Sequence, residues 1–331
     1  MRFGLFIALA VTLLVPVVTG AQVISGLENV GGDTFTMSVG TPYPAPYSQV
    51  TVTLSSNSIP LTNATLSASV NGKQIYAGAA TTFPVQLGAA GTATTVRATV
   101  TSQGSTYNQR LSIEPQDVTI IAEPVSSAPP LYPGKPSVPL QGNVRLVAIA
   151  NLRNLNGIMA NPSTDAYVWT VDGIEIDSSS GVGKSSIDIP SPLEYRESTV
   201  SVVVTDSTGN LIGGTSFSYT AVDPIVRVYE NDPLLGIRYD HALSGSYSIT
   251  GAEATLYAAP FSLPISNGAP TVQWFLDGSP AQTGNSVTLR PAGSGEGSAA
   301  LSLTASGDNA TNAAAGLSLI FGAKQNNLFG L

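Results

Sequence analysis

A pattern that occurs three times in this chain of 331 residues constrains its fold more than any other feature. Each copy is a run of alternating apolar residues that ends in Asn-Gly or Asp-Gly, and these pairs lie 101 and 105 residues apart. Alternation with a period of two indicates a strand with one buried face. Asn-Gly and Asp-Gly favour the positive φ angles of a tight hairpin turn. The predicted turn pairs are Asn71 and Gly72, Asp172 and Gly173, and Asp277 and Gly278.

The alternating positions of each copy are predicted to point into a core. Trp169 and Trp274 occupy the same central position, where one strand of a sandwich commonly buries a large aromatic side chain. Ala68 occupies that position in the first copy, which leaves open whether the first domain is less stable. An exposed platform for stacking on sugars is the alternative for the two indoles. The full sets are Leu66, Ala68 and Val70; Tyr167, Trp169 and Val171; and Val272, Trp274 and Leu276.

Similar short strands flank each copy, and polar turns with Gly, Asn or Asp separate them. Short strands at regular spacing predict an all-β fold of three tandem immunoglobulin-like β-sandwich domains after an N-terminal signal peptide. The expected domains are residues 30–116, 117–222 and 223–323, followed by a C-terminal tail, 324–331. The second domain includes the Pro-rich segment 123–142.

The motif Trp-x-x-Asp-Gly on a mid-domain strand is similar to tandem immunoglobulin-like or PKD-like domains of exported bacterial proteins. The order of the three units also resembles a multi-domain secreted family without an established activity. The resemblance implies a fold and an exported location, and no chemistry follows from it. The first unit departs from the pattern at Ala68, and no Gly-Asp-Gly follows either tryptophan.

The N-terminal residues are typical of a secretory signal. Arg2 supplies a positive charge, residues 3–14 are apolar, and the small residues Thr19–Ala21 precede an expected cut at Gln22. Residues 1–21 are therefore predicted to be a signal peptide. An uncleaved anchor helix is the alternative, although the apolar stretch is shorter than the ~20 residues that span a bilayer. No later segment is apolar and long enough to span, so the mature chain is expected outside the cell, on its surface or in a periplasm.

The composition excludes several classes of chemistry. The absence of Cys excludes disulfides, thiol nucleophiles and Cys-ligated zinc. The single histidine, His241, is the one candidate for a His-dependent triad, and it follows Asp240 directly. Neighbouring residues on an extended strand point to opposite faces, so this pair does not make a dyad. With 13 basic and 21 acidic residues the chain is a poor partner for nucleic acid. No catalytic residue and no cofactor is predicted.

Carboxylates and tyrosines supply two binding hypotheses. Four carboxylates near the second-to-third junction could bind Ca²⁺, which prefers oxygen ligands. A solvated acidic linker is the alternative. The four are Asp223, Glu230, Asp232 and Asp240. Separately, Tyr43, Tyr47 and Tyr132 lie in Pro-rich stretches and could bind a glycan from loops.

The sequence thus predicts a non-enzymatic exported protein with a structural, adhesive or binding role at the cell surface or in a periplasm. Its expected partner is a protein or glycan of the cell surface. Three alternatives stay open. They are a carbohydrate-binding protein that uses the loop tyrosines, a hydrolase that uses His241, and an accessory subunit of a pilus or other envelope assembly that donates an edge strand.

Overall fold

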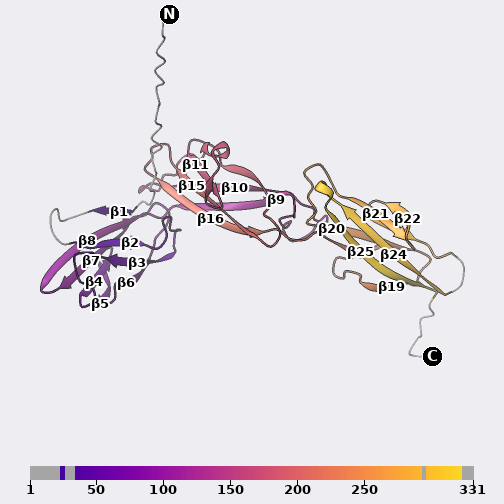
Figure 1. Cartoon of the computed structure of the whole chain (residues 1–331), viewed down its shortest axis with the longest axis horizontal. Coiled ribbons are helices and arrows are strands. Elements are labelled where there is room, and N and C mark those ends of the chain that lie inside the picture. Colours follow the sequence, from indigo (N-terminus) through magenta and orange to yellow (C-terminus); the bar gives the residue numbers. More distant parts are fainter. Residues whose placement is uncertain (1–22, 27–33, 293–295, 323–331) are drawn as a thin grey trace, which may run out of the picture. The chain divides into compact units, whose positions relative to one another are not determined.

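The computed structural model describes residues 23–26, 34–292 and 296–322, and the regular secondary structure of these residues is almost entirely β-strand (Figure 1). The helical elements within these ranges are two three-residue 3₁₀ turns, η1 (Asp177–Ser179) and η2 (Asp308–Ala310). The predicted all-β fold of tandem sandwiches is confirmed. The predicted signal peptide, 1–21, and the tail, 324–331, lie outside the described residues.

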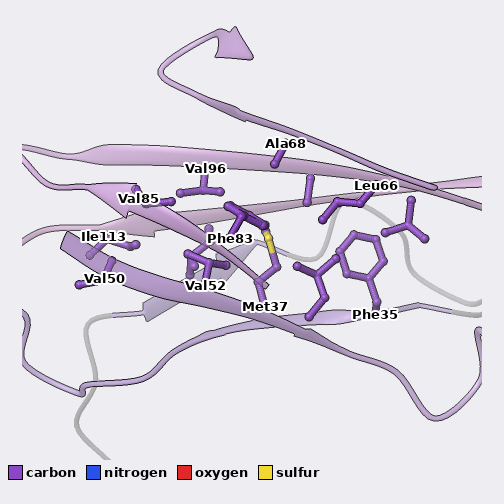
Figure 2. Packing of buried hydrophobic residues seen from close by; sticks show 14 of the residues in the cluster. Phe35, Met37, Val50, Val52, Leu66, Ala68, Phe83, Val85, Val96 and Ile113 are labelled. Atoms are coloured by element: carbon purple, nitrogen blue, oxygen red, sulfur yellow. The ribbon is translucent and has the colours of Figure 1, made fainter. Parts of the chain in front are cut away.

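The first sandwich packs two antiparallel sheets around one core. Its core includes Phe35 and Phe83, each 1% exposed. Figure 2 shows both rings in the same core as Ala68, which is fully buried. The larger sheet has the order β1 (Val23–Gly26), β8 (Ser105–Ile113), β7 (Thr94–Ser102), β4 (Thr65–Val70), β5 (Lys73–Gly78), and the smaller β2 (Thr36–Val39), β3 (Gln49–Ser55), β6 (Thr82–Gln86).

The second sandwich has a sheet of three strands and a sheet of five. The three strands are, in order, β14 (Ser186–Pro190), β10 (Asn143–Asn151) and β9 (Asp117–Pro124). The other sheet has the order β12 (Ile174–Glu175), β11 (Ala166–Val171), β15 (Glu197–Thr205), β16 (Ile212–Thr220), and β13 (Gly181–Val182) also pairs with β11. Buried side chains come from both sheets, for example Leu146 of β10 and Val202 of β15.

The third sandwich encloses a core that contains Trp274 and Leu256, both fully buried. Its first sheet has the order β18 (Gly236–Ile237), β17 (Ile225–Asp232), β20 (Ala254–Phe261), β23 (Ser286–Leu289). Its second has the order β19 (Gly245–Ile249), β25 (Asn312–Phe321), β24 (Gly297–Ser306), β21 (Thr271–Leu276), β22 (Ser279–Thr283).

The described chain forms two compact units. The first contains the first sandwich up to Asp117, together with the short segments Leu152–Met159 and Thr208–Gly213. The second contains the third sandwich and the remainder of the second. The domain limits 30–116, 117–222 and 223–323 stay predictions.

The two tryptophans are held in the same way in their two sandwiches. Both side chains have no exposed surface, and each indole N–H donates to a backbone carbonyl. Trp169 Nε1 donates to the carbonyl of Lys184, and Trp274 Nε1 donates to that of Gly284, both at 2.8 Å. The polar atom of each buried ring therefore has the partner that burial requires.

The three predicted turns share one hydrogen-bond arrangement that reaches a third strand. In each, the turn residue has a φ of 48–50°, and the following glycine has a φ of 78–84°. The turn residue's backbone N–H donates to a carbonyl on the neighbouring long strand, and its side-chain Oδ1 accepts from the N–H of that same residue. The pairs are Asn71 with Thr95 (2.9 and 2.9 Å), Asp172 with Thr199 (2.9 and 2.8 Å) and Asp277 with Ala300 (2.8 and 2.8 Å).

The same arrangement therefore occurs once in each sandwich, in the contacts Asn71–Thr95, Asp172–Thr199 and Asp277–Ala300. In it, a side-chain oxygen takes the place that a main-chain carbonyl occupies in a sheet ladder. The hairpin turn is thereby fixed to the adjacent long strand as well as to its own partner. The Asn or Asp at this position therefore has a role beyond tolerating a positive φ.

Replacement of Trp169 by Ala is expected to lower the free energy of unfolding by about 3–5 kcal/mol, because it empties a filled core position. Urea unfolding followed by circular dichroism measures the loss. Tyr195→Ala is the control, because Tyr195 belongs to the same sandwich but is 87% exposed. A loss no larger than that of the control would contradict the buried role of the indole.

Replacement of Asp277 by Ala is expected to lower the free energy of unfolding by about 2 kcal/mol, because the Ala300 N–H loses its carboxylate acceptor. Asp277→Asn is the matched variant, since Asn71 makes the same contact in the first sandwich. It should retain most of the stability. Urea unfolding measures both variants. If Asp277→Ala and Asp277→Asn lower the free energy of unfolding equally, the hydrogen bond to Oδ1 does not stabilise the fold.

Candidate functional site

The segment that follows β9 is hydrogen-bonded to the segment that follows β20, within the second compact unit. Ser127 makes three of these bonds. Its N–H donates to the Leu263 carbonyl at 2.8 Å, its carbonyl accepts from the Ser262 N–H at 2.9 Å, and its Oγ accepts from the Leu263 N–H at 3.1 Å. Leu263 is fully buried and Ser127 is 7% exposed, so water competes little for these bonds.

Further bonds extend this junction on both sides. The Ile265 N–H donates to the Val125 carbonyl at 3.3 Å, and Asn309 Nδ2 donates to the Gln141 carbonyl at 2.6 Å. Ser126 and Pro264 form an isolated antiparallel bridge. The Pro-rich loop of the second sandwich is thus joined to the third sandwich by hydrogen bonds. We refer to the contacts of residues 125–127 and 141 with residues 262–265 and 309 as the junction.

A groove of about 390 Å³ lies beside the junction. Tyr132, on the Pro-rich loop, packs its ring edge-on against Phe261 with centroids 5.2 Å apart, and it keeps 44% of its surface exposed. Two exposed cations, Lys135 and Arg227, and the exposed Asp223 also line the groove. The groove therefore combines an aromatic surface with more positive than negative charge.

The two cations of the groove are not part of the ion pairs found among the described residues. Those pairs are Arg238 with Asp240 at 3.1 Å and Arg290 with Glu253 at 2.8 Å. Lys135 and Arg227 take part in neither. Both can therefore contact an anionic group that enters the groove.

The four carboxylates of the calcium hypothesis have separate surroundings. Asp223 lines the groove, and Glu230 lies on β17, opposite Leu256. Asp232 accepts the N–H groups of Leu235 and Leu234, which lower its pKa. The hydrogen bond from Arg238 lowers the pKa of Asp240. Among the described residues, no group of three or more His, Asp or Glu side chains is placed to hold a metal ion.

The remaining candidates are dispersed over the surface. His241 is exposed, and its backbone N–H donates to the Arg238 carbonyl at 3.4 Å. Tyr47 is 71% exposed in the first sandwich, at a φ of 57°. Tyr43 is half-buried, and burial raises its pKa. Of the three loop tyrosines, Tyr132 is the one that the structure places in the groove beside Lys135 and Arg227.

The sequence reasoning found Tyr132 but missed most of its surroundings. A Tyr in a Pro-rich stretch signals an exposed aromatic ring, and that signal sufficed for Tyr132. Phe261 ends a strand far along the chain, and Ser127 is one of many serines, so neither carries a local signal. Only the tertiary fold brings them together.

No family model matches the chain, and no curated protein matches it. Solved structures that resemble it include the three N-terminal domains of the highly immunogenic outer capsid protein Hoc of bacteriophage RB49. That likeness has 13% identity and a TM-score of 0.26, and it covers 88% of this chain and 99% of the other.

Two further solved structures show a similar level of likeness. For the fibronectin(III)-like modules of CbhA from Clostridium thermocellum, identity is 12% and the TM-score is 0.25, and the match covers 65% of this chain and 100% of the other. For a 1.5-MDa bacterial ice-binding adhesin, identity is 12% and the TM-score is 0.23, and the match covers 88% of this chain and 98% of the other. The immunoglobulin-like or PKD-like family stays a prediction. Within the described residues, no helix has the length and apolar character that crossing a membrane requires.

Proposed function

We propose that this chain is a non-enzymatic exported protein with a structural or adhesive role at the cell surface or in a periplasm. The junction is the observation that carries the proposal. A protein that transmits force or holds a spacing needs neighbouring domains that resist bending, and domains joined only by a linker move freely. Backbone hydrogen bonds around Ser127 give this chain such a connection. The leader, residues 1–21, supports export.

The groove favours a second, more specific role as a carbohydrate-binding protein. Aromatic side chains provide a large apolar surface with little loss of conformational freedom, and Tyr132 presents such a surface to solvent. Lys135 and Arg227 lie on the same groove. A saccharide that carries a carboxylate matches this combination, because its ring can stack on Tyr132 while its charge meets the two cations.

If the junction couples the second and third sandwiches, their unfolding should coincide, and Ser127→Pro should separate the two transitions. Proline removes the N–H that donates to Leu263. The second and third sandwiches each contain one tryptophan, so Trp274→Phe leaves Trp169 to report on the second and Trp169→Phe leaves Trp274 to report on the third. Urea unfolding followed by fluorescence measures both.

The matched control for the junction experiment is Ser137→Ala, because Ser137 is exposed on the same loop. It should leave the two transitions coincident. Well-separated transitions in the parent chain would contradict a coupled junction and, with it, the structural role argued from that junction.

Replacement of Tyr132 by Ala is expected to weaken binding of an acidic oligosaccharide at least about tenfold, which corresponds to about 1.4 kcal/mol. Oligogalacturonate and a sialylated oligosaccharide are the probes, and calorimetry measures binding. Arg227→Gln should weaken acidic probes while leaving neutral ones unchanged. Tyr47→Ala is the control, because Tyr47 is an exposed tyrosine of the other compact unit.

Either of two results would contradict the carbohydrate role. One is the absence of binding by both acidic and neutral oligosaccharides at millimolar concentration. The other is binding that Tyr132→Ala and Tyr47→Ala change equally. Neither result bears on the junction, so the structural role is tested separately.

A further inference from the structure

The last strand of the larger sheet is covered by a short strand in the first and third sandwiches. In the first, β1 pairs antiparallel with Arg110–Ile113 of β8. In the third, β19 pairs in parallel with Leu317–Phe321 of β25. In both cases this chain supplies the strand that closes the edge.

These covered segments occupy equivalent positions of the repeat. Leu111 pairs with Val96, which pairs with the residue before the turn residue Asn71. Leu317 pairs with Leu301, which pairs with the residue before Asp277. In the second sandwich, Val171 precedes the turn and pairs with Val200. The equivalent residue of β16 is therefore the one opposite Val200.

The hydroxyl contact between Thr199 and Ser218 locates that residue. Their oxygens lie 2.8 Å apart, so Ser218 lies opposite Thr199 and Phe217 lies opposite Val200. The equivalent segment of β16 is therefore Ser216–Thr220. In the described residues β16 ends its sheet, and no strand pairs with its outer edge.

The Pro-rich loop explains why this edge is open. Its nearest ladder contact is a single bridge from Pro139 to Val222, beyond the end of β16. The segment 123–142 contains six prolines, and proline has no N–H to give to a ladder. The loop follows the first strand of its sandwich, as the segment containing β19 does in the third, but it forms no covering strand.

The open edge lacks the features by which proteins prevent pairing between edges. Exposed edge strands commonly carry Lys, inward charges, Pro or a bulge. Ile212–Thr220 contains no charged residue and no proline over nine residues. Nothing in its sequence opposes the addition of another strand.

The strand is also complementary to itself. If two copies run antiparallel with Ser218 opposite Ser218, then Phe217 lies opposite Tyr219 and Ser216 lies opposite Thr220. Phe217 and Tyr219 share a face, with ring centroids 5.8 Å apart, whereas Ser216, Ser218 and Thr220 are exposed. Aromatic residues would then pair with aromatic residues and hydroxyls with hydroxyls, both of which stabilise cross-strand neighbours.

We propose that β16 pairs antiparallel with β16 of a second copy of this chain. The pairing places a two-fold axis at Ser218 and joins two five-stranded sheets into one continuous sheet. Because the strand is neutral, two copies meet without repulsion between its side chains. Main-chain hydrogen bonds supply the attraction, as in strand addition generally.

A single cysteine tests the axis directly, because the chain contains no Cys of its own. Directly opposed residues of an antiparallel pair have Cα atoms about 4.5–5.5 Å apart, within the range of a disulfide. Under mild oxidation, Ser218→Cys should form a covalent dimer at least tenfold faster than Ser302→Cys. Ser302 is an exposed serine on β24, which has a partner strand on each side.

Light scattering over a range of concentrations provides the second measurement. The parent chain should show a dimer whose fraction rises with concentration, and Ser218→Pro should stay monomeric. In a chain that also carries Trp274→Phe, fluorescence of Trp169 shows whether the proline variant is folded. If it is not, the comparison of the two cysteine variants decides. Equal cross-linking rates, or a parent chain that is monomeric at every concentration, would overturn the proposal.

Discussion

The side-chain oxygen at each hairpin turn is the constraint on which the rest of the structure depends. It fixes the turn to a third strand in all three sandwiches, through Thr95, Thr199 and Ala300. The register of that pairing sets which residues of the central strand face inward. A slip of one residue would move every core side chain to the solvent face. The contact is the same in the first sandwich, where Ala68 replaces the tryptophan of the other two.

The turns and the first two buried positions of each alternating set could be predicted because they depend on residues that are close in sequence. The last position of each set differs from the prediction: Val70 and Val171 are half-buried and Leu276 is 37% exposed, because each lies directly before its turn. Asp172 and Gly173, for example, specify a hairpin by their own conformational preferences. The third partner of the turn, Thr199, could not be predicted, because it lies on another strand and contributes only backbone atoms. The same holds for the carbonyl of Lys184 that accepts from Trp169, because a residue of any type can supply a backbone carbonyl.

The groove shows where sequence reasoning ends. The Pro-rich setting of Tyr132 favours a glycan contact from its loop, and the residue is 44% exposed. The calcium hypothesis grouped Asp223, Glu230, Asp232 and Asp240 because they are near in sequence, and it stays a prediction. In the fold, Asp240 accepts a hydrogen bond from Arg238, and Asp232 accepts from the backbone of the turn that follows it. Nearness along a chain of strands is a weak guide to nearness in space, since adjacent hairpin residues can face different surroundings.

The prolines of segment 123–142 link two properties that look independent. They shape the loop that carries Tyr132, and they also remove the donors that a covering strand would need beside β16. A homologue that lost these prolines could gain a closing strand and lose the aromatic groove in the same step. Ligand recognition and self-association would then be inherited together, as a single trait encoded in one loop.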